Sequence, residues 1–190
     1  MKVAAFLGSP RVGGNSEILL KEAIRAVEDA GHKVTLMRPH AMDISPCNNC
    51  GGCEETGKCV IEDDMGLVYE AIYESDRFIV ASPIFFFGLP SQIKALIDRC
   101  QAIWCEKYLL KRPIPAAVYG RKGLLVMVGG MKKEEGFRSG EATAKAFFRT
   151  IGVPTHETLY FDGVDAKGAI RDHPTALHNV YEAAKRLVAI

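Results

Sequence analysis

Four of the six cysteines lie close together, and their spacing is typical of a metal or redox site. Cys47, Cys50, Cys53 and Cys59 form the pattern C-x2-C-x2-C-x5-C. Three thiolates so spaced can wrap one side of a cubane iron–sulfur cluster, and the fourth can close its far corner after the turn near Gly57. The residues therefore favour a [4Fe–4S] cluster in a cysteine-rich loop at 43–60.

Other chemistry for these cysteines stays open at this point. Structural zinc usually takes two separated C-x2-C pairs or a mixture of Cys and His, and no His lies in this stretch. The N-terminal apolar run is too short for a signal peptide, so we expect a cytoplasmic protein, where disulfides are poorly suited. Zinc and free thiols remain the alternatives, and we interpret Cys100 and Cys105 as packing or interface thiols.

A glycine-rich turn from Gly8 to Ser16 predicts a phosphate site after the first expected strand. In such a turn, backbone N–H groups and the positive end of the following helix face the anion. The nucleotide-triphosphate loop and the G-x-G-x-x-G dinucleotide fingerprint are both absent. A tight turn capped by asparagine is the alternative interpretation. The polar side chains of the turn suit a terminal monophosphate held without a metal: Ser9, Arg11, Asn15 and Ser16.

A run of three aromatic residues follows the third expected strand, inside the segment 82–90. Phe85, Phe86 and Phe87 cannot all point into the core at the edge of a sheet, so at least one should lie in a ligand crevice. A flat heteroaromatic ring is a natural partner, and the backbone of such a loop can bond its polar edge. This loop alone would favour core packing, but together with the phosphate turn it favours a ligand site.

The elements that must position these loops alternate along the chain. Short apolar runs lack polar alternation, which is typical of strands buried on both faces of a parallel sheet. Stretches with apolar residues at helical spacing lie between them. The fourth of these helices is expected to bury Ala142, Ala146, Phe147 and Ile151, after a solvated loop at 132–135. The expected strands are 3–7, 34–37, 78–81, 124–128 and 158–161, and the expected helices cover 18–27, 67–72, 93–97, 142–151 and 177–188.

This alternation predicts βαβ units with right-handed crossovers and an α/β fold of three layers. Five strands in so short a chain fit a doubly wound, flavodoxin-like parallel sheet with the order 2-1-3-4-5. In such sheets the ligand lies beyond the carboxyl ends of the strands, where the strand order reverses. The phosphate turn and the aromatic loop follow the two strands that flank this point.

Length and charge bound the remaining possibilities. The chain of 190 residues is the right size for one domain, so we expect 1–190 to be a single unit. Its formal net charge of +1 offers no overall field for nucleic acid or anionic lipid. No apolar run near the middle of the chain approaches the length of a spanning helix. We therefore expect neither a nucleic-acid nor a membrane partner.

Three segments resemble a known family of flavoproteins. Gly8-Ser9-Pro10-Arg11 with Gly14-Asn15-Ser16 is similar to the phosphate loop of the NADPH-dependent FMN reductase-like proteins. The run from Ser82 to Gly88, followed by residues 92–99, resembles their flavin-ring loop and the next helix. Val128-Gly129-Gly130 stands in the position of their third flavin loop. The cysteine loop with Val60, Ile61 and 63–65 resembles the compact motif of the iron–sulfur flavoprotein branch.

The resemblance implies FMN, an oligomer and, in that branch, a [4Fe–4S] cluster bound by Cys47, Cys50, Cys53 and Cys59. It implies an oxidoreductase that passes electrons between the flavin and the cluster, with NAD(P)H as a donor and a small-molecule or protein redox partner. A homodimer or homotetramer is expected. An NAD(P)H-dependent FMN or quinone reductase without a cluster is the alternative. The flavin contacts implied are Ser9, Arg11, Asn15, Ser16, Pro83, Ile84, Phe85, Phe86, Phe87, Gly88, Gly129 and Gly130.

Overall fold

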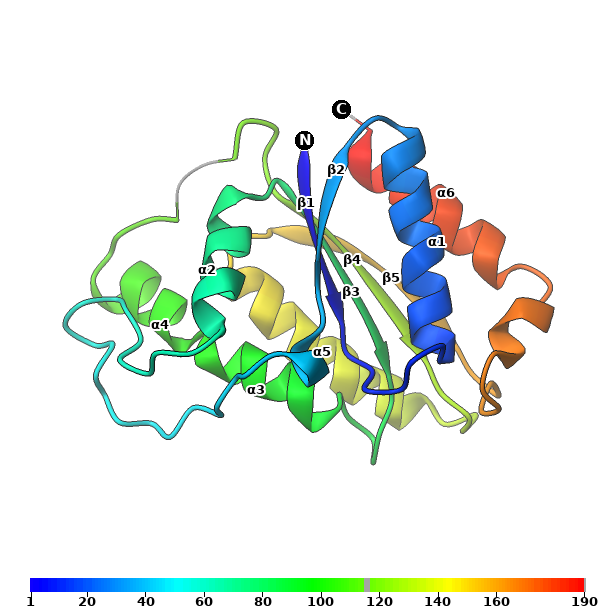
Figure 1. Cartoon of the computed structure of the whole chain (residues 1–190), viewed down its shortest axis with the longest axis horizontal. Coiled ribbons are helices and arrows are strands. Elements are labelled where there is room, and N and C mark those ends of the chain that lie inside the picture. Colours follow the sequence, from blue (N-terminus) through cyan, green and yellow to red (C-terminus); the bar gives the residue numbers. More distant parts are fainter. Residues whose placement is uncertain (115–116, 190) are drawn as a thin grey trace.

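The computed structural model describes residues 1–114 and 117–189, so the expected end of the domain at 190 lies outside the described residues. A parallel sheet of five strands forms its centre, in the order β2-β1-β3-β4-β5 (Figure 1). This confirms the predicted order. The strands are β1 (Lys2–Leu7), β2 (Lys33–Met37), β3 (Arg77–Pro83), β4 (Lys122–Val128) and β5 (Thr155–Phe161).

Burial explains why these runs are strands. Every residue of β1 after Lys2 is buried, because β2 and β3 pair with both of its edges and its side chains belong alternately to the core clusters on the two faces of the sheet. The register places Phe6 between Met37 of β2 and Val80 of β3. The edge strands β2 and β5 are only partly buried. Their outer backbone edge is unpaired within the sheet, and polar residues are tolerated there.

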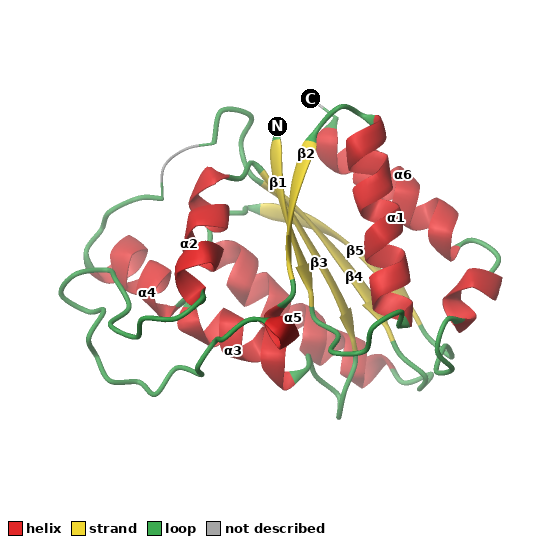
Figure 2. Ribbon diagram, in the orientation of Figure 1, coloured by secondary structure: helices red, strands yellow, loops and turns green. Residues whose placement is uncertain are grey.

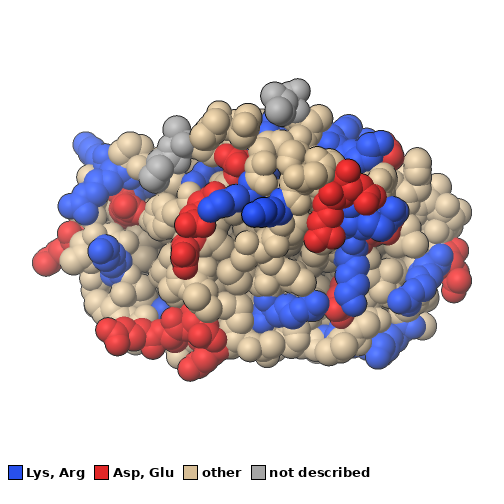
Figure 3. Space-filling view, turned by 45° about the horizontal axis from the view of Figure 1, so that its top comes forward, with Lys and Arg blue, Asp and Glu red and all other residues tan. Residues whose placement is uncertain are grey.

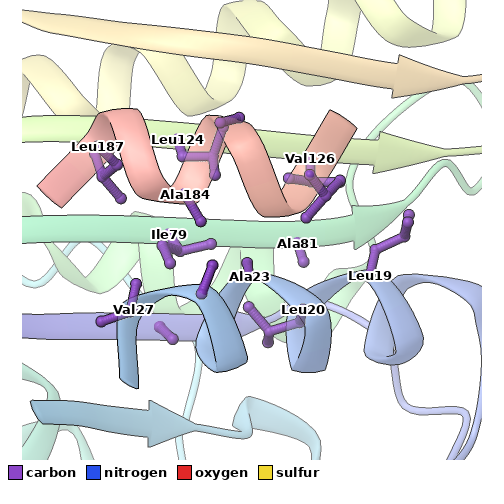
Figure 4. Close-up of a cluster of buried hydrophobic side chains, with 14 of the residues drawn as sticks. Leu19, Leu20, Ala23, Val27, Ile79, Ala81, Leu124, Val126, Ala184 and Leu187 are labelled. Carbon is purple, nitrogen blue, oxygen red and sulfur yellow. The ribbon is translucent and has the colours of Figure 1, made fainter. Parts of the chain in front are cut away.

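Helices cover both faces of the sheet, which gives the three layers expected (Figure 2). On one face α1 and α6 pack side by side against β1, β3 and β4, where Leu20, Ala184 and Ile79 belong to one buried cluster (Figure 4). The other face carries a second cluster with α2, α3 and α5. The helices are α1 (Asn15–Asp29), α2 (Met65–Glu74), α3 (Ser91–Arg99), α4 (Gln101–Trp104), α5 (Glu134–Thr150) and α6 (Ala176–Val188), with short η1 (Pro39–Ala41), η2 (Cys105–Leu109) and η3 (Ala169–Asp172).

The helix α5 differs from its expected form. It begins at Glu134, so the acidic half of the expected loop 132–135 is its first turn. Its buried face uses Phe137, Ala144 and Phe147, whereas Ala142 and Ala146 are exposed. Gly136 and Gly140 let the helix pack closely against Ile84 and Met127. Because glycine adds no apolar side chain, the spacing of apolar residues does not indicate the first turns of α5.

Charged side chains and helix hydropathy were the basis of the expectations about partners. Acidic and basic side chains lie next to each other over the face in Figure 3. Among the described residues, no helix combines the length and apolar character that crossing a bilayer requires.

The carboxyl ends of the strands meet at one edge of the sheet, where the loops of interest begin. Gly8 directly follows β1, and its N–H donates to the carbonyl of Ala81 in β3 over 2.8 Å. A Cβ at this position would lie 2.6 Å from Ser82 Oγ, so only glycine permits this approach. The two loops after β1 and β3 are therefore held against each other.

Candidate functional site

The loop after β1 lines a small cavity of about 100 Å³ at the carboxyl edge of the sheet. Ser9 and Ser16 are buried there, whereas the Arg11 side chain is exposed at the rim. The backbone N–H of Arg11 donates to Ser9 Oγ over 3.1 Å, which fixes the turn. The other loops complete the lining with Pro83, Ile84, Phe85, Val128, Gly129, Gly130, Val164 and Asp165, beside Gly14 and Asn15.

The beginning of α1 is suited to an anion. Gly14 stands in the capping position and has no side chain, so none caps the first turn of the helix. The N–H groups at the start of a helix lack internal partners and carry a partial positive charge. They open beside the cavity that Ser9, Arg11 and Ser16 line. The residues present therefore fit a phosphate.

The one carboxylate in this first turn is already neutralised. Glu17 is buried and accepts from the Gly13 N–H over 2.7 Å, and it pairs with Lys21 and Arg38, each over 3.1 Å. Burial alone would raise the pKa of Glu17, but the Gly13 bond and the two cations lower it below its usual value. The negative charge of Glu17 is therefore used to stabilise the turn.

Asn15 lines the cavity, and its side-chain amide is bonded to the segment that follows β5. Its Nδ2 donates to the carbonyl of Ala166 over 3.0 Å, and its Oδ1 accepts from the N–H of Ile170 over 3.3 Å. Both ends of the amide thus hold the segment after β5. The Asn15 side chain therefore anchors that segment beside the cavity.

This anchored segment brings two residues to the site that the sequence did not suggest. Asp165 lines the cavity and packs on Gly130, where a Cβ would come within 2.8 Å of its side chain. Lys167 lies over the phosphate turn, 3.7 Å from Nζ to the position of a Cβ on Gly13. Both follow β5, the strand farthest from the site, and no local motif marks them.

The aromatic loop after β3 is a two-residue hairpin with a strained tip. Phe85 and Gly88 exchange backbone bonds of 2.9 Å in both directions. The two residues between them, Phe86 and Phe87, have φ values of +47 and +60. Tips of this kind strongly prefer asparagine and glycine. Non-glycine residues held in this region indicate a constraint from function, at a cost of about 1–3 kcal/mol each.

The strained tip helps to form a larger cavity of about 500 Å³. Phe86, Phe87 and Phe137 are among its apolar walls, and Phe137 stacks on Tyr160 with ring centroids 4.8 Å apart. Gly88 lines neither this cavity nor the phosphate-sized one, and its backbone pairs with that of Phe85 to close the hairpin. Four residues line both this cavity and the phosphate-sized one: Ile84, Gly129, Gly130 and Asp165. The two adjoin, so an anionic group and a flat ring of one molecule fit together there.

The cysteine loop leaves the sheet after β2 and returns at α2. Cys47, Cys50, Cys53 and Cys59 all line one cavity of about 20 Å³. Within 1–114 and 117–189, no three His, Cys, Asp or Glu side chains stand in a metal-binding arrangement. The cavity holds about one water molecule, so a cluster would require this loop to widen. Cys50 lies on its exposed side.

Arg99 at the end of α3 holds both ends of this loop. Its side chain is fully buried, and its guanidinium donates to the carbonyl of Ser45 over 2.8 Å and to that of Ile61 over 3.1 Å. Its Nε is buried with no partner among the described residues, and Arg99 lines the cysteine cavity. An unsatisfied buried donor is unusual in a native structure. Together with four thiols, it fits an anionic group in this cavity.

The fifth sulfur near the cavity belongs to Cys105, at the start of η2. Its Sγ lies 3.6 Å from Cys53 Sγ. Burial and the bond to Cys105 raise the pKa of the Cys53 thiol to about 12 in the chain alone. Cys100 is buried elsewhere and donates to the carbonyl of Leu96. The packing role expected of Cys100 agrees with this position, whereas Cys105 contacts the cysteine loop itself.

Comparison with known proteins gives the family. The sequence profile described as NADPH-dependent FMN reductase matches residues 1–161. The chain is 34% identical over 118 residues to an iron-sulfur flavoprotein of Methanosarcina thermophila, covering 62% of each chain. It is 36% identical over 103 residues to an iron-sulfur flavoprotein of Methanocaldococcus jannaschii, covering 54% of this chain and 53% of that one. The aligned stretches span less than two thirds of these relatives.

A solved structure shows the same fold. The NAD(P)H:quinone oxidoreductase from Methanothermobacter marburgensis superposes with a TM-score of 0.72 at 15% identity, over 100% of this chain and 98% of that one. The family match ends with β5, so the segment that carries Asp165 and Lys167 lies beyond it. The match contains the phosphate turn, the aromatic loop and the cysteine loop. The chain belongs to the NADPH-dependent FMN reductase family.

Proposed function

We propose that this protein is an FMN-dependent oxidoreductase whose cysteine loop holds a [4Fe–4S] cluster that exchanges electrons with the flavin. One observation carries the flavin part: a phosphate-sized cavity at the uncapped start of α1 adjoins an aromatic cavity of about 500 Å³. When bound, FMN supplies hydride acceptance and release of single electrons, and a cluster carries one electron at a time.

Each loop has a separate part in this proposal. Ser9, Arg11 and Ser16, with the first N–H groups of α1, bind the phosphate. Lys167 adds a cation above them, and Asn15 holds the segment that presents it. The loops at 83–88 and 129–130 enclose the isoalloxazine ring and keep water from one of its sides. No side chain is proposed as a general base.

The cluster part rests on the cysteine cavity and on two relatives. Cys47, Cys50, Cys53 and Cys59 would be the ligands, and the unpartnered Arg99 Nε would face the negative charge of the cluster. Both relatives named above are called iron-sulfur flavoproteins, which supports this assignment. We further propose that residues 1–190 form one FMN-binding domain, that the donor is NAD(P)H, and that the protein assembles as a homodimer or homotetramer.

A second candidate is an NAD(P)H-dependent FMN or quinone reductase whose cysteines bind no cluster. The small volume of the cysteine cavity and the contact between Cys53 and Cys105 favour it. A structural neighbour is also named as an NAD(P)H:quinone oxidoreductase. Both candidates bind FMN, but only the first contains iron.

Protein purified without oxygen separates them. Flavin, iron and acid-labile sulfide are measured together with the absorption spectrum, and NADH and NADPH are then tested as reductants. We expect about one FMN, about four iron atoms and about four sulfide ions per chain. Flavin without iron would support the second candidate. A colourless protein that takes up no FMN would contradict both.

A further inference from the structure

Asp165 is the one acidic residue among the described residues that line either of the two adjoining cavities. It lines both of them, together with Ile84, Gly129 and Gly130, none of which has a polar side chain. Asp165 therefore belongs to the boundary between the phosphate-sized cavity and the aromatic one, and it supplies the polar side chain there.

Hydrogen bonds fix the backbone on both sides of Asp165. The N–H of Val164 donates to the carbonyl of Gly129 over 3.1 Å, and the carbonyl of Ala166 accepts from Asn15 Nδ2 over 3.0 Å. These bonds hold the segment after β5, drawn in orange, beside the start of α1 (Figure 1). The side chain of Asp165 is exposed on this fixed backbone, so the carboxylate has a defined place without being buried.

The carboxylate of Asp165 lies directly against Gly130. A Cβ on Gly130 would lie 2.8 Å from the Cβ of Asp165 and 3.1 Å from both its Cγ and its Oδ1. Since Gly130 also lines both cavities, this oxygen lies at their shared boundary. Glycine at position 130 leaves room for the carboxylate, which a larger residue would displace.

The two cavities offer different chemistry on either side of this boundary. Arg11 lines the smaller cavity and Lys167 lies over the phosphate turn, so cations serve the anionic end. The larger cavity has the aromatic walls. In FMN the ribityl chain, which carries several hydroxyl groups, joins the phosphate to the ring and must cross the boundary. Hydroxyl groups donate hydrogen bonds, and an ionised carboxylate only accepts them.

We infer that Asp165 accepts hydrogen bonds from the ribityl hydroxyl groups and thereby selects flavins that carry this chain. The inference rests on the FMN site of our proposed function and uses the cavities of about 100 and about 500 Å³. Hydrogen bonds to a charged acceptor are about twice as strong as bonds between neutral groups. A carboxylate at this boundary therefore binds the polyol chain, although it would repel a phosphate placed in contact with it.

The test compares riboflavin with lumiflavin, which has the same ring but a methyl group in place of the ribityl chain. Fluorescence quenching measures the affinity of each for the full chain freed of bound flavin. Riboflavin has no phosphate, so repulsion between anions does not enter. Asp165→Ala should weaken riboflavin binding about tenfold and leave lumiflavin binding unchanged. Asp165→Asn keeps one acceptor oxygen, so its affinity for riboflavin should lie between those of the parent and Asp165→Ala.

Asp162→Ala is the matched control, because Asp162 is an exposed acidic residue of the same segment that lines neither cavity. Both of its affinities should equal those of the parent. Unchanged or tighter riboflavin binding in Asp165→Ala would overturn the inference. An equal loss for both flavins would also overturn it, because the carboxylate would then act on the ring or on the shape of the cavity. A parent that binds neither FMN nor riboflavin would instead refute the proposed flavin site itself.

Discussion

Arg99 and Asp63 form a buried ion pair that joins α3 to the end of the cysteine loop. Arg99 Nη1 lies 2.6 Å from Asp63 Oδ2, and Nη2 lies 3.1 Å from Oδ1, so the contact is bidentate. The Arg99 side chain is 0% exposed and that of Asp63 is 4% exposed. Asp63 also accepts from the backbone N–H groups of Ser45 and Met65, each over 3.0 Å. The pair therefore fixes where the cysteine loop begins and ends.

Replacement of Asp63 should destabilise the fold strongly. Asp63→Asn leaves the buried Arg99 charge without its partner, which typically costs about 3–5 kcal/mol. The measurement is the free energy of unfolding in urea. Asp98→Asn is the control, because Asp98 pairs with Lys94 on the exposed face of α3, and such pairs contribute roughly 0.3–0.5 kcal/mol. If both variants lost the same free energy of unfolding, the buried Arg99–Asp63 pair would contribute no more to stability than the exposed Lys94–Asp98 pair.

The same pair predicts an acid dependence of stability. Burial alone would raise the pKa of Asp63, but bonds from Arg99, Met65 and Ser45 hold it below its usual 3.8. A lowered pKa in the folded state contributes stability that is fully present above the unfolded value. This contribution is lost as the pH falls through the lower, folded value. Unfolding in urea from about pH 5 to about pH 2 should show a steeper loss in the parent than in Asp63→Asn. Parallel curves would contradict this.

Removal of the Arg11 guanidinium should weaken the binding of FMN. A charge-assisted contact to the phosphate is lost, and we expect affinity to fall about tenfold, or about 1.4 kcal/mol. Quenching of flavin fluorescence on binding measures this. Riboflavin, which lacks the phosphate, should bind Arg11→Ala and the parent equally well.

The control for Arg11 is Arg25, which belongs to α1 and does not line the cavity. Arg25→Ala removes an exposed arginine that pairs with Glu22 and Asp29. Its affinity for FMN should stay at the parent value. If Arg11→Ala also bound FMN like the parent, the phosphate would have to lie elsewhere.

The strained hairpin predicts a stabilising substitution. Phe86 is fully exposed and has a positive φ, so its ring contributes little packing while its backbone is strained. Asparagine tolerates this conformation, and Phe86→Asn should raise the free energy of unfolding by about 0.5–1 kcal/mol. Phe85→Asn is the comparison, because Phe85 lies outside the positive-φ pair and the same substitution there relieves no backbone strain. A loss of more than about 1 kcal/mol in Phe86→Asn would show that the ring packs after all.

A cysteine substitution separates the two proposed cofactors. Cys50→Ala should abolish iron binding and leave FMN bound, because Cys50 lines only the cysteine cavity. Iron and flavin analysis of the anaerobically prepared variant measures both. Cys100→Ala should retain both cofactors. Iron retained in Cys50→Ala would remove Cys50 from the ligand set.

The sheet was predictable because its signal is local. Runs such as 3–7 and 124–128 are buried on both faces, and an uninterrupted apolar run marks them without any knowledge of the partners. The order of the strands followed from alternation with helices. The positions of the glycine-rich turn after β1 and of the aromatic loop after β3 were predictable for the same reason, since each motif is contiguous and follows a strand.

Contacts between distant segments were not predictable. The Asn15 amide bonds to residues 166 and 170, more than 150 positions away, so sequence alone suggested a phosphate contact. In the sequence, Arg99 belonged only to the run 92–99 that resembles the helix after the flavin-ring loop, and nothing there indicated that its guanidinium donates to the carbonyls of Ser45 and Ile61. Lys167 follows the fifth strand, and nothing nearby in the sequence points toward Gly13.

The central claim is that the phosphate of FMN lies at the start of α1. A crystal structure of the protein soaked with FMN tests it most directly. We predict density for the phosphate beside Ser9, Arg11 and Ser16, with the ring in the cavity bounded by Phe87 and Phe137. A crevice that remains vacant at saturating FMN, or is filled by the chain itself, would contradict the account.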